Sequence, residues 1–448
     1  MRYIPNTEEN IQRMLEEIGV DNIGDLFKTV PGKYLLDKEL NLPSPLSELE
    51  LMKHMKELNE KNASAADFNF FLGGGVYNHF IPSVMKYIVS RPEFYTSYTP
   101  YQPEVSQGTL QAMFEFQTLM CGLLGMDASN ASLYDGASAA AESVLMALRI
   151  NKQDRIAVSS TIHPDYRRVI RTYCDNGNTE IVDIPFDERG MTDLEKLKEA
   201  LQKGLSCAVL QSPNFFGIVE DLREYEKLIH ESNALLIVAF SEPIAFGLLR
   251  PPGDFEADIC CGEGQSLGIL PGFGGPHLGI LTAKEAYVRN IPGRIVGRTR
   301  DEDGRDAYVL TLTAREQHIR REKARSNVCT NQGLCALMAT VYLEGLGKSG
   351  IKKLAHINHK RAEYAKGKLR EIGWIDLRFS SPTFNEFVLK LKHKPEEVLE
   401  KLLDRKIVAG LSLGRFYDDL KDSLLVSFTE MNTKEDIDNF TACLNELY

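Results

Sequence analysis

The stretch CAVLQSPNFFGIVEDLREYEKLIHESNALLIVAF, residues 207–240, decides the fold. It begins with a short apolar run, CAVLQS, and ends with a second one, ALLIVAF, and a helical segment is expected from Leu222 between them. Short continuous apolar runs are typical of strands buried on both faces, and strands that alternate with helices are typical of a parallel sheet. The stretch therefore predicts a strand–helix–strand unit of an α/β protein.

The same alternation extends in both directions from this unit. Helices are expected over Gly136–Arg149, from Pro164, and over Asp193–Lys203. Further strands are expected at Arg155–Ser160, Ile181–Phe186, Ala257–Gly262 and His277–Ala283. The pattern predicts a mostly parallel sheet that helices cover on both faces.

The regions on either side of this pattern differ from it. Residues 1–70 are expected to form a helical arm, with one helix capped by Asn6 and another over Leu46–Lys61. The large α/β domain is expected over residues 71–325, and a small α+β domain over residues 326–448. The run TAREQHIRREKARSN, residues 313–327, predicts a charged helix at the junction.

Composition excludes several classes of function. The chain has 448 residues and a net charge of −11, which makes nucleic acid an unsuitable partner. The N-terminal sequence MRYIPNTEENIQRMLEEIG lacks the apolar core of a signal peptide, and no apolar run is long enough to span a bilayer. We therefore expect a cytoplasmic protein without a membrane partner. The eight cysteines form no paired CxxC sets, so we expect reduced, mostly buried thiols and no metal site.

Polar residues at the expected strand ends are candidates for a ligand site, because open parallel sheets bind ligands at the carboxyl ends of their strands. Ser241 follows ALLIVAF, and Gln265 follows ADICCG. Gly136, Ala137 and Ser138 begin a helix with small residues, which allows backbone N–H groups to approach an anion. The alternative for this segment is a tightly packed helix start.

Several longer motifs resemble one family. They are EFYTSYTPYQPEVSQGTLQAMFEFQTLMCGLLGMD (93–127), YDGASAAAE (134–142), QSPNFFG (211–217), GFGGPHLG (272–279) and REQHIRREKARSNVCTNQ (315–332). Together they resemble the P-protein of the glycine cleavage system, glycine decarboxylase. The resemblance is to the N-terminal half of that enzyme, which in many prokaryotes is a separate alpha chain.

The resemblance implies the type I fold of pyridoxal phosphate (PLP) enzymes: an N-terminal arm, a large α/β domain and a small C-terminal domain. Active sites in this class form between two chains. The implied reaction decarboxylates glycine and transfers its aminomethyl group to the lipoyl arm of H-protein.

Two residues that such a cofactor site needs are missing. A PLP enzyme requires a lysine for the Schiff base and an acid for the pyridinium nitrogen. Gln265 stands at the lysine position that the resemblance implies, and Ser241 at the position of the acid. We therefore expect no catalytic residue in this chain and PLP held by a beta partner. Gly136, Ala137, Ser138, His163 and Asn214 would form a degenerate cofactor pocket.

Other motifs are expected to complete the partner's site. Tyr95, Tyr98 and Tyr101 are spaced by three in a proline-rich loop, and Thr330 and Asn331 are candidates for a contact with the cofactor phosphate. The alternatives are a packed aromatic loop for the tyrosines, helix capping for Thr330 and Asn331, and a structural role for His163.

Four arginines lie in GRIVGRTRDEDGR, at positions 294, 298, 300 and 305. Because three acids lie among them, a solvated, salt-bridged loop is expected. The alternative is an interface loop near the mouth of the active site, or a docking patch for an acidic carrier.

Three functions are compatible with these residues. The first, which we favour, is a subunit of a heteromeric glycine decarboxylase, an α2β2 assembly that acts on glycine and lipoylated H-protein. The second is a stand-alone PLP enzyme with an unrecognised lysine. The third is a non-catalytic scaffold that docks the lipoyl carrier. The missing lysine favours the first over the second, and the tyrosine and Thr-Asn motifs favour it over the third.

Overall fold

The computed structural model describes residues 5–36, 38–175, 177–272 and 274–448, in two separate units. The first unit, up to Asn62, contains α1 (Glu8–Ile18) and α2 (Glu48–Asn59). These helices begin at Thr7 and Ser47, whose hydroxyls accept hydrogen bonds from the first turn. The cap of α1 is Thr7 and not the expected Asn6, because the Thr7 side chain is the one that accepts the Asn10 N–H. Within the arm predicted over residues 1–70, Asn69–Phe70 (β1) belongs to the second unit, Ala63–Tyr448.

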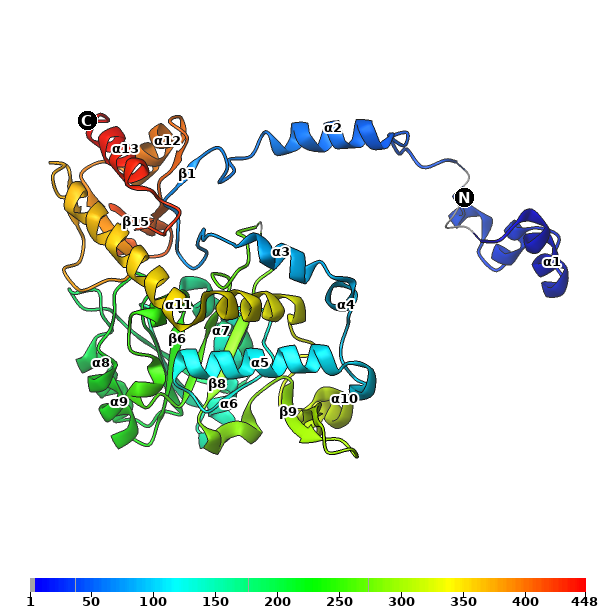
Figure 1. The fold of residues 1–448 in the computed structure, drawn as a ribbon, viewed down its shortest axis with the longest axis horizontal. Helices are drawn as coiled ribbons and strands as arrows, with labels where there is room; N and C mark the ends of the chain where they lie inside the picture. The colour runs from blue at the N-terminus through cyan, green and yellow to red at the C-terminus, as the bar shows by residue number, and fades with distance from the viewer. Residues whose placement is uncertain (1–4, 37, 176, 273) are drawn as a thin grey trace. The chain divides into compact units, whose positions relative to one another are not determined.

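A seven-stranded sheet forms the centre of the second unit, in the order β2-β8-β7-β6-β5-β3-β4 (Figure 1). Strands β3 to β7 run parallel to one another, and β8 is antiparallel to β7 and β2. The strand bounds are Ala128–Ser129 (β2), Arg155–Ser159 (β3), Glu180–Ile184 (β4), Cys207–Gln211 (β5), Leu235–Phe240 (β6), Ile259–Glu263 (β7) and Gly279–Ala283 (β8).

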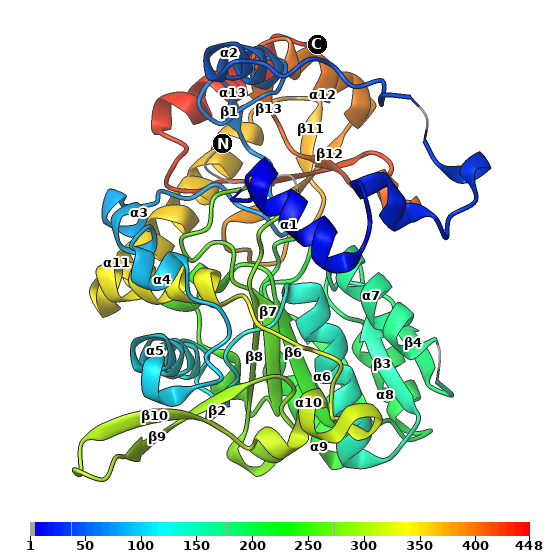
Figure 2. The ribbon, with the colours of Figure 1, turned by 90° about the vertical axis from the view of Figure 1, so that its right-hand side faces the viewer.

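Each strand contributes alternate side chains to two separate cores. Ala208 and Leu210 of β5 face the first core, and Cys207 and Val209 face the second. Helices α5 (Gln107–Leu124), α8 (Leu194–Leu201), α9 (Leu222–Glu231) and α11 (Gly333–Leu369) pack in the first core. Helices α6 (Gly136–Asn151) and α7 (Pro164–Cys174) pack in the second, on the other face of the sheet (Figure 2). The mostly parallel, doubly covered sheet predicted from the sequence is confirmed.

Local signals place the starts of these helices. Asp193 and Asp221 accept hydrogen bonds from the first turns of α8 and α9. His163 caps α7, whose first residue is Pro164, a residue that needs no N–H partner there. The unit over residues 207–240 therefore folds as its sequence predicts.

A second, smaller sheet follows after a bend in α11. The bend lies at Gly347, whose φ of 59° interrupts the helix. The sheet is antiparallel, in the order β11-β12-β15-β14, and α12 and α13 pack against it in a core that includes Phe387 and Phe428. The bounds are Ile375–Leu377 (β11), Glu386–Leu391 (β12), Pro395–Leu403 (α12), Ile407–Val408 (β13), Leu411–Ser412 (β14), Ser423–Ser427 (β15) and Lys434–Asn445 (α13). The domain boundaries at residues 70 and 325 stay predictions.

A short strand that precedes the large sheet in the sequence, β1, packs with the C-terminal region. Strand β1 pairs in parallel with β13. Phe71 is then buried in the C-terminal core, stacked on Phe440 with ring centroids 4.3 Å apart. Residues 73–79 continue from this anchor to the carboxyl ends of the large sheet, and α3 (Ser83–Val89) and α4 (Pro92–Tyr95) follow.

The charged helix expected over residues 313–327 is wrong. The structure has α10 (Gln317–Arg320) and two short 3₁₀ turns there, and Arg321 has a φ of 53°, which no α-helix continues through. The side chain of Arg315 donates to the carbonyls of Ile291, Gly293 and Leu312. These tertiary contacts override the local helix propensity of the segment.

The loop expected over residues 294–305 is instead a hairpin of β9 (Ile295–Arg300) and β10 (Asp306–Thr311). Arg298 and Arg305 are exposed and paired with Asp306 and Asp303, as expected for a solvated segment. Arg294 contradicts that expectation, because only 3% of its surface is exposed.

Most of the cysteines are buried, as the sequence predicts. The eight cysteines are free thiols, and five of them are buried. In the described ranges, no helix combines the length and the apolar character needed to cross a bilayer.

Candidate functional site

Gln265 lies just beyond β7 and binds the backbone of Tyr77. Its Oε1 accepts the Tyr77 N–H at 2.9 Å, and its Nε2 donates to the Tyr77 carbonyl at 3.1 Å and to the Ile269 carbonyl at 2.5 Å. Gln265 is 1% exposed, so its amide is engaged on both sides within the protein. A carboxamide cannot form an imine, and the amide nitrogen of this one already donates two hydrogen bonds within the chain.

The side chain of Tyr77 fills the space between Gln265 and Ser241. Its hydroxyl donates to Glu386 Oε2 at 2.9 Å and lies 3.4 Å from Ser241 Oγ. Burial raises the pKa of Tyr77 well above its ordinary value, so the phenol stays protonated. An aromatic side chain of the chain itself thus occupies the strand-end pocket.

Glu263, the last residue of β7, binds the N-terminus of α6. Its Oε2 accepts the Gly136 N–H at 3.0 Å, and its Oε1 accepts the N–H groups of Gln265 and Leu278 at 3.0 and 2.9 Å. The site at which a helix N-terminus would hold an anion is therefore taken by a carboxylate of the chain. A Cβ at Gly136 would collide with the Tyr166 hydroxyl, which explains why the helix begins with glycine.

The two residues after Gly136 take part in the helix start. Ser138 forms a capping box with Asp135: its N–H donates to Asp135 Oδ1 at 2.7 Å, and its Oγ accepts the Asp135 N–H at 3.1 Å. Ala137 is half-buried and packs against the second core. This geometry matches the packed helix start that was the alternative for this segment.

His163 lies against the segment that carries Tyr77. Its Nε2 donates to the Gly74 carbonyl at 2.7 Å, and its Nδ1 accepts the Asp165 N–H at 3.1 Å, which defines a neutral ring. Burial lowers the pKa of His163, in agreement with that state. A Cβ on Gly75 would lie 2.8 Å from Nε2, so the backbone covers the ring closely. These contacts favour the structural role that was the alternative for His163.

Asn214 is used in a turn rather than in the pocket. Its Nδ2 donates to the Gly190 carbonyl and to Glu220, both at 2.9 Å, and its Oδ1 accepts the N–H groups of Phe216 and Ile218. The amide of Asn214 is thus engaged on both sides within the turn.

These contacts test whether the pocket fits PLP. The cofactor would need an amine, an acid at its ring nitrogen, an anion site for its phosphate and space for its ring. This chain has Gln265 and Ser241 at the first two positions, Glu263 in the anion site and Tyr77 in the ring space. The residues present do not fit the cofactor.

An unrecognised catalytic lysine would need a free amine, and two lysines can be checked for one: Lys284, whose sequence predicts a solvated helix start, and Lys366, which the structure shows to be buried. Lys284 lies 3.3 Å from Glu256 and 3.4 Å from Asp258, so it is paired as a cation. Lys366 is buried, but its Nζ donates to Glu363 at 2.6 Å and to Thr383 at 2.5 Å. Neither amine is free to act as a nucleophile.

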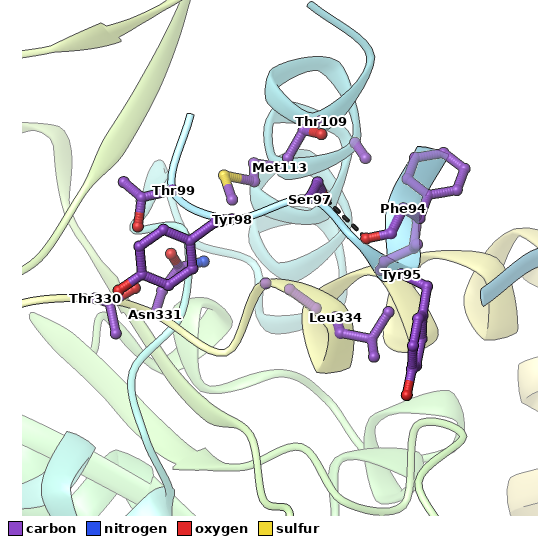
Figure 3. A pocket seen from close by; sticks show the side chains of 14 residues that line it. Phe94, Tyr95, Ser97, Tyr98, Thr99, Thr109, Met113, Thr330, Asn331 and Leu334 are labelled. Atoms are coloured by element: carbon purple, nitrogen blue, oxygen red, sulfur yellow. Dashed lines mark hydrogen bonds between the residues drawn. The ribbon is translucent and has the colours of Figure 1, made fainter. Parts of the chain in front are cut away.

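A second group of candidate residues lines a cavity of about 170 Å³ on the surface (Figure 3). Tyr95 and Tyr98 line it, and they are 69% and 82% exposed. Thr330 and Asn331, just before α11, line it as well. In Figure 3 the ring of Tyr98 lies toward Thr330 and Asn331, and that of Tyr95 lies at the other end, near Leu334. The structure thus brings together four of the five predicted interface residues.

Tyr101, the fifth, contacts Arg294 instead of the cavity. Arg294 Nη2 lies 3.3 Å from the Tyr101 hydroxyl and donates to the Cys329 carbonyl at 2.8 Å. Its Nη1 donates to Thr330 Oγ1 at 3.1 Å and lies 3.4 Å from both Thr99 Oγ1 and Asn331 Oδ1. No pattern in the sequence separates Arg294 from its exposed neighbours, except its place directly before the buried pair Ile295 and Val296.

The backbone around Thr330 is anchored to the large sheet region. Asn331 Nδ2 donates to the Ala131 carbonyl at 2.8 Å, and the Gln332 N–H donates to Ser132 Oγ at 3.1 Å. The Cys329 N–H donates to the Tyr134 hydroxyl at 3.1 Å. The Thr330 hydroxyl therefore sits on a fixed support at the surface.

Comparison with known proteins gives one consistent result. The family model described as "Glycine cleavage system P-protein" matches residues 1–444. The chain is 47% identical over 447 residues to "Probable glycine dehydrogenase (decarboxylating) subunit 1" of Geobacillus sp. (strain WCH70), covering 100% of this chain and 99% of the relative. It is also 47% identical to the protein of the same name in Desulfitobacterium hafniense (strain DSM 10664 / DCB-2), with full coverage of both chains.

Solved structures extend the likeness. The chain superposes on a structure titled "Crystal structure of glycine decarboxylase (P-protein) of the glycine cleavage system, in inhibitor-bound form" with a TM-score of 0.91, 40% identity and full coverage of both chains. A sphingosine-1-phosphate lyase of Burkholderia pseudomallei K96243 shares the fold alone, with a TM-score of 0.64, 14% identity and coverage of 94% of this chain and 93% of the other.

Proposed function

Because the chain belongs to the glycine cleavage system P-protein family, we propose that it completes the active site of a beta partner chain, which holds the PLP. The family assigns it to the glycine-decarboxylating enzyme as subunit 1 of a multi-subunit complex, on the fold of PLP-dependent type I enzymes. The finer proposal is that this subunit alone is inactive.

One observation carries the proposal. The chain fills its own strand-end pocket with Tyr77 and Glu263, while it exposes Tyr98 in a cavity that Thr330 also lines. Tyr98 is 82% exposed in a proline-rich loop, and burying an aromatic ring at an interface is favourable. These features support a role for the cavity as one wall of a site that a second chain closes.

The chemistry of the cavity residues suggests their roles. In the complex, PLP on the beta partner would supply the electron sink that decarboxylation requires. The hydroxyl of Thr330 and the amide of Asn331 suit the binding of an anionic group, and the phenols of Tyr95 and Tyr98 suit the orientation of a small polar substrate such as glycine. Tyr101 would not contact the substrate, and would support this site through its hydrogen bond with Arg294.

The remaining parts of the proposal concern the assembly. We propose an α2β2 complex whose acceptor is the lipoyl group of H-protein. The cytoplasmic location expected from the N-terminal sequence stays a prediction.

The first experiment tests the isolated chain. It is purified alone, mixed with PLP, treated with borohydride and examined by mass spectrometry. No lysine should carry a reduced cofactor adduct. A stoichiometric adduct on one lysine would instead support the stand-alone enzyme.

The second experiment uses the complex with the beta chain and measures glycine-dependent exchange of carboxyl carbon with bicarbonate. Thr330→Ala should lower the affinity of the complex for PLP by about tenfold or more, because a hydrogen bond to a charged group contributes about 1.5–3 kcal/mol. Tyr98→Phe should lower the exchange rate. Thr172→Ala and Tyr173→Phe, which change exposed residues of α7, serve as matched controls. Unchanged activity in both test variants would overturn the assignment of this cavity.

A further inference from the structure

We propose that Arg294 is the positioning residue that fixes this chain's contribution to the neighbouring active site. The proposal rests on the proposed function, since it assumes that the cavity of Tyr98 and Thr330 faces a partner. Arg294 would act by setting the relative position of residues 97–101 and 329–331, without touching substrate or cofactor.

The guanidinium of Arg294 is directed inward. Its two terminal nitrogens have five acceptors within 3.4 Å, namely Thr99, Tyr101, Cys329, Thr330 and Asn331. Its Nε faces Glu316 at 3.9 Å, and the side chain is 3% exposed. No direction remains in which this cation could reach a ligand in a partner chain, which separates a positioning role from a catalytic one.

The residues that Arg294 joins are far apart in the sequence. Thr99 and Tyr101 precede α5, whereas the segment from Cys329 to Asn331 precedes α11, about two hundred residues later. The second segment is anchored independently, by the bonds of Cys329 and Asn331 to Tyr134 and Ala131. Arg294 therefore links residues 95–101, which we call the tyrosine loop, to that anchored segment.

The tyrosine loop depends on this contact. The hydrogen bonds of Thr96 and Ser97 go to Pro92 and Phe94, within the same turn, so they shape the loop but do not tie it to the sheet. Arg294 binds the chain directly after Tyr98, at Thr99 by a hydrogen bond and at Tyr101 by a hydrogen bond and a cation–π contact of 5.4 Å. Tyr98 is thus held outward by a residue that it does not itself contact.

Only arginine has the geometry for this task. A planar guanidinium presents donors to two groups of acceptors at once, whereas a lysine ammonium presents one nitrogen. Arg298, four residues later in the same hairpin, is exposed and pairs with Asp306 at 2.6 Å. It provides a control for the loss of one arginine from this segment.

The test uses Arg294→Ala and Arg294→Lys in the complex with the beta chain, with Arg298→Ala as control. Both Arg294 variants should assemble and lose about 100-fold in kcat for the exchange reaction, since small displacements of positioning groups have effects of that order. The KM for glycine should change much less. Added guanidinium chloride, at concentrations below those that unfold the protein, should restore kcat in Arg294→Ala and leave Thr330→Ala unaffected. Arg298→Ala should behave as the unchanged protein.

The outcomes separate this inference from the proposed function. If Thr330→Ala and Tyr98→Phe lose activity while Arg294→Lys keeps full kcat, the positioning role is wrong and the interface assignment stands. If all variants keep full activity, the interface assignment itself is wrong. If Arg294→Ala does not assemble, the kcat of Arg294→Lys decides the question. If Arg294→Ala does assemble, guanidinium should restore its activity. A loss of activity that parallels a lower melting temperature and is not restored by guanidinium overturns the positioning role.

Discussion

The carboxamide of Gln265 and the backbone of Tyr77 form a pair of hydrogen bonds, 2.9 and 3.1 Å long, at the carboxyl end of the large sheet. Gln265, which the sequence predicts at the position of a catalytic lysine, therefore holds a segment of its own chain at the end of β7. The phenol of Tyr77 then reaches Glu386 of the smaller sheet, so the same segment links the two sheets. Tyr77, Gln265 and Ser241 are all buried, so this end of the large sheet is part of the protein interior.

Gln265→Lys should not create a PLP site. Lysine has no acceptor for the buried Tyr77 N–H, and leaving that group unpaired costs about 1–3 kcal/mol, while Tyr77 still fills the pocket. The melting temperature should fall, and no absorbance of lysine-bound PLP should appear on titration. Gln111→Lys on the exposed face of α5 is the control. A borohydride-reducible adduct on the introduced lysine would contradict the prediction.

Glu263→Ser should open an anion site at the start of α6. The N–H of Gly136 would lose its carboxylate, so the variant should be less stable, and inorganic phosphate should raise its melting temperature. The unchanged protein should show no such response beyond that to sodium chloride at equal ionic strength. Equal responses of the two proteins to phosphate would show that Glu263 does not occupy an anion site.

His79 should make the stability of the protein fall at alkaline pH. Burial alone would lower its pKa, but Glu242 and Glu430, each 2.9 Å from a ring nitrogen, outweigh burial and raise the pKa of His79 to about 10. Because the folded pKa lies above the unfolded value of about 6.5, the stabilisation is fully present below pH 6.5. It is lost as the pH rises through about 10.

His79→Gln tests this expectation by melting temperatures measured from pH 6 to 10. The variant should be less stable than the unchanged protein at pH 6, and the difference should shrink as the pH rises. His54→Gln, in α2 of the first unit, is the control for the loss of a histidine. A difference that stays constant over this range would contradict a charged His79.

The ionisation of Glu386 should lower the stability of the folded protein between about pH 4.5 and pH 8. Burial raises its pKa to about 8, so the folded protein keeps this carboxyl protonated while the unfolded chain ionises it above about 4.5. The corresponding part of the stability is present below pH 4.5 and is lost as the pH rises to about 8. Glu386→Gln keeps a neutral group that can accept the Gly74 N–H, so its melting temperature should depend less on pH over this range. Parallel pH curves for the two proteins would exclude a neutral Glu386.

Local patterns were sufficient for much of the fold. The apolar runs at 207–212 and 234–240 became β5 and β6 because they are buried on both faces, and capping residues such as Asp221 fixed where the helices begin. The prediction of a charged helix over residues 313–327 was wrong, because the structure of this segment depends on hydrogen bonds from Arg315 to the carbonyls of Ile291 and Gly293. A local sequence pattern contains no information about such distant partners.

The sequence by itself determined the family and the doubly covered sheet, because both are set by residue type and short-range order. Only the tertiary structure decided that Tyr77 and Glu263 bind at the ends of strands β6 and β7 and that Arg294 is buried. Tyr77 lies 164 residues from Ser241 and 188 from Gln265, and Arg294 lies 193 residues from Tyr101. The physical reason is that hydrogen bonds and packing between such distant residues exist only after the chain has folded.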